Sequence, residues 1–166
     1  MNASMIGLLL SLPLANFLVG CATIVYINGS YIESIDLPTL GNDEAKKVLD
    51  GFNAKVGGGI VRYGKGYRPI RIREGEPINF DPDKVTVGQA MPLPNGCQIT
   101  LNPKHIYDSK DFREVLLHEY LHCFNYGHNE KDRNDLMYPT TGGNVSEENI
   151  THYAKELKKK LYGRTE

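Results

Sequence analysis

Two histidines four positions apart, with a glutamate directly after the first, are the residues in this sequence best suited to catalysis. They are His118 and His122, and Glu119 follows His118. On a helix, side chains four positions apart lie one turn apart on the same face, so both imidazoles can reach one ion. A carboxylate beside them can take a proton from a water molecule. The motif predicts a metal site with Glu119 as its general base.

A third histidine follows where a sharp turn after the helix would bring it back. Zinc in catalytic sites takes three protein ligands and keeps one position open for water. Asn125 stands between His122 and His128, and Asn is the commonest substitute for Gly in the left-handed conformation that ends a helix abruptly. The spacing therefore predicts that His128 completes a site for Zn²⁺.

The whole string over residues 118–128 resembles the metzincin signature His-Glu-x-x-His-x-x-Gly-x-x-His, and it departs from that signature only at Asn125. Residues 136–139, Leu-Met-Tyr-Pro, resemble the Met-turn of the matrixin branch, in which Met137 would form an apolar floor under the metal. The segment that follows resembles the closing helix of matrixins. The resemblance is specific over residues 112–163 and only topological over residues 22–103.

The resemblance implies a zinc-dependent endopeptidase that hydrolyses peptide bonds with metal-activated water. It also implies that an extended peptide or protein substrate lies along an edge strand near residues 85–91 by strand addition. His105 and His152 match no position of the motif, and Tyr138 directly follows the Met-turn methionine, so we assign none of them to the metal. No prosegment fits between Cys21 and the first helix, so latency through a cysteine switch is not expected.

Two other functions fit the same residues. One is a non-catalytic, zinc-stabilised binding module that holds a partner protein on the cell surface. The other is a metal-dependent amidase or deacylase that uses the same site on non-peptide amides. An intact Glu119 favours an enzyme over a binding module, because a purely structural site needs no base.

The sequence predicts that these residues are positioned by an α+β fold with a mixed, twisted sheet of about five strands and three helices. Apolar spacing predicts helices over residues 43–54, from 109 or 111 to about 124, and over 146–162. The later start rests on a capping box formed by Asp111 and Glu114. In the second helix the apolar residues cover one arc, and His118 and His122 lie outside it. Expected strands cover residues 22–28 or 31–36, then 60–63, 69–73, 85–88 and 98–101, with a turn through Pro92, Pro94 and Asn95-Gly96 between the last two.

The first residues of the chain predict export. Residues 6–20 are apolar but interrupted by Pro13 and Asn16, which favours a signal peptide over residues 1–20 rather than a membrane span. Leu-Val-Gly before Cys21 resembles the lipobox of bacterial lipoproteins, in which the cysteine is acylated. These features predict a catalytic domain over residues 22–166 in the cell envelope, anchored by a lipid on Cys21 to a bacterial membrane or otherwise secreted. The alternative is a buried N-terminal segment with an incidental cysteine.

The net charge and the other two cysteines bear on the partners of the chain and on its compartment. The formal net charge of -1 argues against nucleic acid as a partner, and the lysines at 155 and 158–160 are expected on a solvated helix end. We expect a monomer. Cys97 and Cys123 either pair in an oxidising compartment or remain two buried thiols, and the sequence leaves both open.

Overall fold

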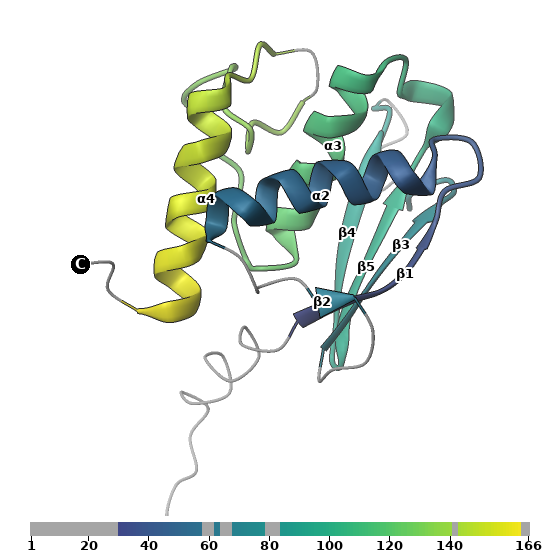
Figure 1. Ribbon diagram of the computed structural model, residues 1–166. Helices are drawn as coiled ribbons and strands as arrows, with labels where there is room; N and C mark the ends of the chain where they lie inside the picture. Colours follow the sequence, from purple (N-terminus) through teal and green to yellow (C-terminus); the bar gives the residue numbers. More distant parts are fainter. Residues whose placement is uncertain (1–29, 58–61, 64–67, 79–83, 141–142, 164–166) are drawn as a thin grey trace, which may run out of the picture.

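The computed structural model describes residues 30–57, 62–63, 68–78, 84–140 and 143–163 (Figure 1). The predicted signal peptide over residues 1–20, the lipidation site Cys21 and the strand at 22–28 lie outside these residues. Among the described helices, none is both long and apolar enough to span a membrane.

The described strands form one mixed sheet in the order β2-β1-β3-β5-β4. Their bounds are β1 Ser30–Asp36, β2 Arg62–Tyr63, β3 Arg68–Glu74, β4 Gly88–Leu93 and β5 Gly96–Leu101. β1 runs parallel to β2 and β3, and β3 runs parallel to β5, whereas β4 is antiparallel to β5 at the edge. The predicted α+β class with a mixed sheet is confirmed.

The edge strand β4 differs from its prediction. The expected strand over residues 85–88 is wrong, because β4 begins only at Gly88 and continues to Leu93. Before it, the Val87 carbonyl accepts one backbone hydrogen bond from Asn102. Pro92, expected in the turn, lies in the strand, which an edge strand permits because proline lacks only the donor of a ladder bond. The predictions at residues 31–36, 69–73 and 98–101 are confirmed.

The helices are α2 Asn42–Val56, α3 Ser109–His122 and α4 Glu147–Tyr162, and a short 3-10 turn, η1 Pro103–His105, precedes α3. α3 begins at the earlier of its two predicted starts, since the Asp108 carboxylate accepts the backbone N–H of Asp111 as the N-cap. The capping box of Asp111 and Glu114 is therefore wrong. Both residues lie inside the helix, and the side chain of Glu114 is buried.

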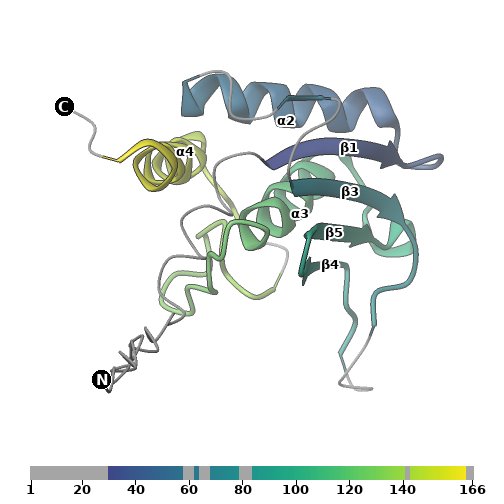
Figure 2. The same ribbon diagram turned by 90° about the horizontal axis from the view of Figure 1, so that it is seen from below.

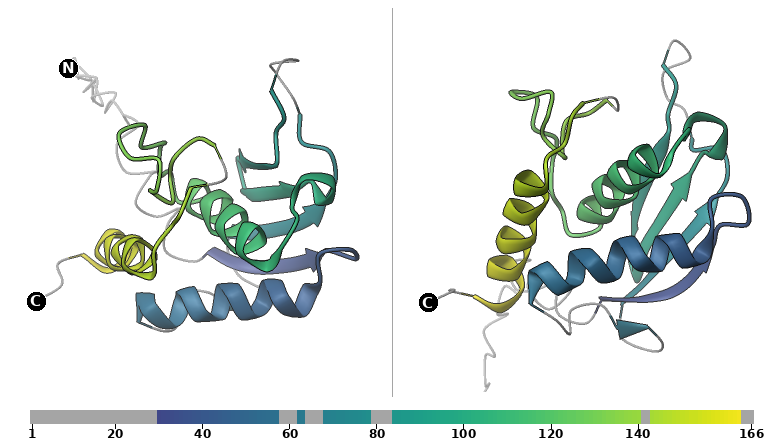
Figure 3. Two further views of the ribbon diagram at one scale, coloured as in Figure 1. Left: turned by 90° about the horizontal axis from the view of Figure 1, so that it is seen from above. Right: turned by 45° about the horizontal axis from the view of Figure 1, so that its top comes forward.

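The helices α2 and α3 lie side by side across one face of the sheet, and α4 packs against α2 beyond the sheet (Figures 2 and 3). α3 contributes Leu116, Leu117, Tyr120 and Leu121 to the core, each almost fully buried. This is the predicted apolar arc. The side chains of His118 and His122 lie outside this arc and are only half-buried, near the C-terminal end of α3.

Candidate metal centre

Three imidazoles converge at the end of α3. The Nε2 atom of His122 lies 3.0 Å from that of His118 and 3.1 Å from that of His128. Ring nitrogens of all three residues lie within 4.8 Å of one another, which is close enough to hold one metal ion. The structure thus brings the three predicted ligands together.

Hydrogen bonds to backbone carbonyls decide which nitrogen of two imidazoles faces the centre of the cluster. Nδ1 of His118 lies 2.7 Å from the Leu136 oxygen, and Nδ1 of His122 lies 2.7 Å from the Tyr126 oxygen. A carbonyl oxygen only accepts, so each Nδ1 carries the proton and each Nε2 of the neutral ring presents a lone pair.

This arrangement suits a cation. Burial lowers the pKa of His118 to about 4 and also lowers that of His122, so both rings are neutral near pH 7. Two neutral rings that each hold their proton on Nδ1 cannot form a hydrogen bond between their Nε2 atoms. Together with the ring of His128, they give three imidazole nitrogens close to one point, which is the donor set that zinc takes in some catalytic sites.

The turn after α3 brings His128 back, as Asn125 predicts. Asn125 has a φ of 60°, and it is the only described residue other than glycine with a positive φ. Its N–H bonds the His122 carbonyl, and the next N–H, from Tyr126, bonds the Leu121 carbonyl. These two bonds define a Schellman motif with Asn125 at its left-handed position. The departure from the glycine of the resembled signature is compatible with the turn.

The segment with Met137 lies against the cluster and links to two of its ligands. Met137 is fully buried, and its carbonyl accepts the N–H of Asn129, the residue after His128. The preceding carbonyl, that of Leu136, holds His118. The turn therefore supports His118 and the segment that carries His128 at once.

Asp135 organises that turn, and sequence reasoning missed it. Its carboxylate accepts hydrogen bonds from the Met137 N–H, the Tyr153 hydroxyl and the amides of Asn149 and Asn129. Burial acts to raise the pKa of Asp135, but these hydrogen bonds together outweigh it, so the pKa is lowered. Tyr153 and Asn149 come from α4, which is thus part of the support of the site.

Glu119 lies beside the cluster in a setting suited to a base. It is 6 % exposed, its Oε2 has no hydrogen-bond partner among the described residues, and the backbone of Ala90 on β4 hydrogen-bonds the carboxylate. Burial raises the pKa of Glu119 to about 7 in the protein without metal, and the bond from Ala90 opposes this rise. A carboxylate with a pKa near neutrality and one free oxygen can exchange a proton at physiological pH.

Gly88 lets β4 approach Glu119 closely. A β-carbon at this position would lie 2.7 Å from Cγ1 of Val115 and 2.9 Å from Oε1 of Glu119. Both distances are shorter than real contacts allow, so a larger residue would displace the carboxylate or the strand. Sequence reasoning gave Gly88 no role, because nothing local marks the close approach.

A disulfide between Cys97 and Cys123 joins β5 to the residue directly after His122. It settles the choice left open by the sequence in favour of pairing. The two cysteines are 26 residues apart. Closing a loop of that length lowers the entropy of the unfolded chain and thereby stabilises the folded state by about 3.5 kcal/mol. The bond also anchors the end of the helix that carries two of the imidazoles.

Lys160 of α4 braces the turn between the second and third ligands. Its Nζ donates to the Phe124 carbonyl at 2.6 Å and to the Asn125 carbonyl at 3.4 Å, and it lies 4.5 Å from the centre of the Tyr126 ring. The Tyr126 carbonyl in turn holds His122. Lys160 is therefore not simply part of a solvated run of lysines, as the sequence suggested.

If the three histidines hold a metal ion, replacing Lys160 by methionine is expected to weaken its binding by about tenfold, the low end of the effect of residues that support metal ligands. Methionine keeps the aliphatic stem but leaves the two carbonyls without their donor. Competition with a chromophoric chelator measures the affinity. Lys159→Met, at an exposed neighbouring position, is the matched control. Equal affinities for the two variants would show that the brace does not position the ligands.

The remaining candidate residues lie elsewhere. His105 lies in η1, and His152 is exposed on α4 with its ring against Tyr153, so neither belongs to the cluster. Tyr138 lines a cavity of about 380 Å³ that opens beside His118 and Glu119. Sequence reasoning did not locate this cavity.

In comparisons with known proteins, no family model matches the chain and no curated protein sequence matches it.

Proposed function

We propose that this chain is a metal-dependent hydrolase and, more specifically, a zinc-dependent endopeptidase of the metzincin type related to the matrixin branch. The observation that carries the proposal is the convergence of three imidazole Nε2 atoms beside a buried carboxylate with a free oxygen. A metal site with a structural role alone gains nothing from burying Glu119, because burial of a carboxylate with one unsatisfied oxygen costs free energy. The residues His118, His122 and His128 would hold the zinc.

Bound zinc supplies Lewis-acid activation of a water molecule and of the substrate carbonyl. Glu119 accepts the proton from the attacking water and then donates it to the departing amine nitrogen. The N–H of Ala90 and the close contact with Gly88 keep the carboxylate in one orientation. The carbonyls of Leu136 and Tyr126 keep the imidazoles of His118 and His122 oriented throughout.

The edge strand β4 supports an extended peptide as the substrate. It pairs with β5 alone among the described strands, so main-chain groups on its other edge, apart from the Ala90 N–H that Glu119 accepts, can bond to a peptide. The strand starts at Gly88, which lines the cavity together with His118 and Glu119. A peptide added along β4 would therefore pass directly in front of the proposed base. The proposed position of the substrate is therefore along Gly88–Leu93, which overlaps the position at residues 85–91 predicted from the sequence.

The disulfide supports export as the setting of this function. Disulfides persist in oxidising compartments and are rare where glutathione keeps thiols reduced. Cys97 and Cys123 are paired and buried, so an oxidising cell envelope or extracellular space fits the chain better than a reducing cytosol. Acylation of Cys21 remains a prediction from the sequence.

Metal removal tests the proposal. The purified chain is expected to contain one equivalent of zinc and to cut members of a peptide library, and a chelator is expected to abolish cleavage until zinc is restored. Mass spectrometry of the digest records the cleaved bonds. A zinc-loaded chain that cuts no peptide would contradict the proposal. Cleavage of non-peptide amides alone would instead identify an amidase, and the absence of any hydrolysis would favour a binding module.

A further inference from the structure

The cavity beside the metal centre contains a buried acidic residue that the proposed reaction does not use. Its volume is about 380 Å³, which is enough for a large side chain. Its walls are formed by the residues just before β4 and at its start, by α3 and by the segment after Asp135. The apolar lining residues include Val85, Val87, Val115, Leu136, Pro139 and Val145. Such walls suit an aliphatic stem.

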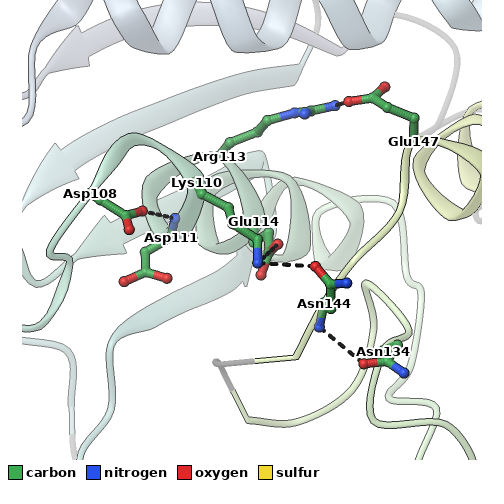
Figure 4. Close-up of polar contacts among 8 residues, drawn as sticks. All are labelled: Asp108, Lys110, Asp111, Arg113, Glu114, Asn134, Asn144 and Glu147. Carbon is green, nitrogen blue, oxygen red and sulfur yellow. Dashed lines mark hydrogen bonds and ion pairs between the residues drawn. The ribbon is translucent and has the colours of Figure 1, made fainter.

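Glu114 is the acidic residue in question, and it lies one helical turn before His118 on the cavity wall. Its side chain is 11 % exposed, and it forms a long ion pair with Lys110, with 3.9 Å between Nζ and Oε1 (Figure 4). Lys110 is itself 54 % exposed and also donates to the Asn144 side chain at 3.3 Å. Burial raises the pKa of Glu114, and neither Lys110 nor the backbone bond from Val145 reverses the rise. The carboxylate is therefore only partly compensated.

Among the acidic residues that line the cavity, Glu114 is the one best placed to pair with a bound ligand. The oxygens of Asp135 already accept hydrogen bonds from Tyr153 and from neighbouring groups. Glu119 serves the reaction. Lys84 and Arg133 have exposed side chains, where water screens their charge. A cation that enters the cavity past the apolar walls would meet Glu114 with little competition.

We propose that this cavity is a specificity pocket that binds a lysine or arginine side chain of the substrate, with Glu114 as the specificity-determining residue. The apolar walls would contact the methylene stem, and the carboxylate would pair with the charged end. The position beside His118 and Glu119 places the selected residue next to the cleaved bond. The inference rests on the proposed peptidase function.

A peptide series tests the pocket under conditions of hydrolysis. The substrates share one scissile bond and carry lysine, arginine, norleucine or glutamine in turn at each flanking position. The zinc-loaded full chain is expected to prefer lysine or arginine at one position by about 10- to 100-fold in kcat/KM, the range of a hydrogen bond to a buried charge. Glu114→Gln is expected to remove this preference and to leave norleucine peptides cut as before. Glu148→Gln, at an exposed site on α4, is the control.

A binding measurement tests the pocket without hydrolysis. The zinc-loaded chain is titrated with n-butylguanidinium and with its neutral analogue n-butylurea, and NMR or calorimetry records binding. The cation is expected to bind the unaltered chain at least tenfold more tightly than the urea and to lose this advantage in Glu114→Gln. Equal binding of the two probes, or a cation preference that survives Glu114→Gln, overturns the assignment. A chain that cuts peptides without regard to charge overturns the pocket alone, whereas a chain that cuts no peptide overturns the proposed function. Equal zinc content and equal thermal unfolding show that the variant is folded.

Discussion

Glu119→Gln is expected to lower kcat/KM for peptide hydrolysis by about 10²- to 10⁴-fold, the usual contribution of general acid–base catalysis. Glutamine keeps the size of the side chain and can still accept the Ala90 hydrogen bond, so the packing against Gly88 is preserved. It cannot take a proton from water. The zinc content is expected to remain at one equivalent, because Glu119 is not among the three clustered ligands. Steady-state kinetics and metal analysis on the same preparation measure both quantities.

Glu130→Gln is the matched control for this variant, because Glu130 is an exposed carboxylate in the loop after His128. It makes the same change of side chain near the cluster and is expected to leave kcat/KM unchanged. Undiminished hydrolysis by Glu119→Gln would rule out its role as the base. A loss of zinc together with activity would instead mean that the carboxylate contributes to metal binding.

Replacing His128 by alanine is expected to abolish stoichiometric zinc binding and, with it, hydrolysis. The affinity should fall by more than about 100-fold, since replacing residues that merely support a ligand already costs 10- to 100-fold. His128 is the sharpest test among the three ligands, because its ring comes from the loop rather than from α3. The helix and its buried arc do not depend on it, so the circular dichroism spectrum should persist.

His152→Ala is the control for ligand loss, because His152 is exposed on α4 and lies outside the cluster. Zinc titration of both variants and of the unaltered chain measures the change in zinc affinity. Retention of one tightly bound zinc by His128→Ala would mean that two histidines and another group make the site, and the proposed arrangement would have to be abandoned.

The local part of the site was predictable from the sequence because its causes are local. Helical periodicity alone places His118 and His122 on one face, opposite the apolar arc of α3. The left-handed turn follows from the preference of Asn125 for that conformation. Similar short-range patterns indicate α4 and the strands β3 and β5, whose apolar residues are regularly spaced.

The supporting contacts were not predictable, because each joins residues that are distant in sequence. Lys160 reaches the Phe124 carbonyl across 36 positions, and Gly88 contacts Glu119 only through the approach of β4 to α3. Asp135 has no local pattern that distinguishes it from an ordinary loop residue. The start of β4 and the role of Glu114 were misjudged for the same reason. Pairing and burial there are decided by the tertiary environment rather than by propensity.

Because α4 braces the segments around His128 and Asp135, the order of synthesis affects when the three imidazoles are held in place. Ribosomes deliver a protein from its N-terminus, so His118, His122 and His128 emerge before Asn149, Tyr153 and Lys160 exist to brace them. A nascent chain carries every ligand without the scaffold that aims them. We therefore expect the three imidazoles to hold their arrangement only after α4 has docked, and a chain that ends before α4 to bind a metal ion more weakly.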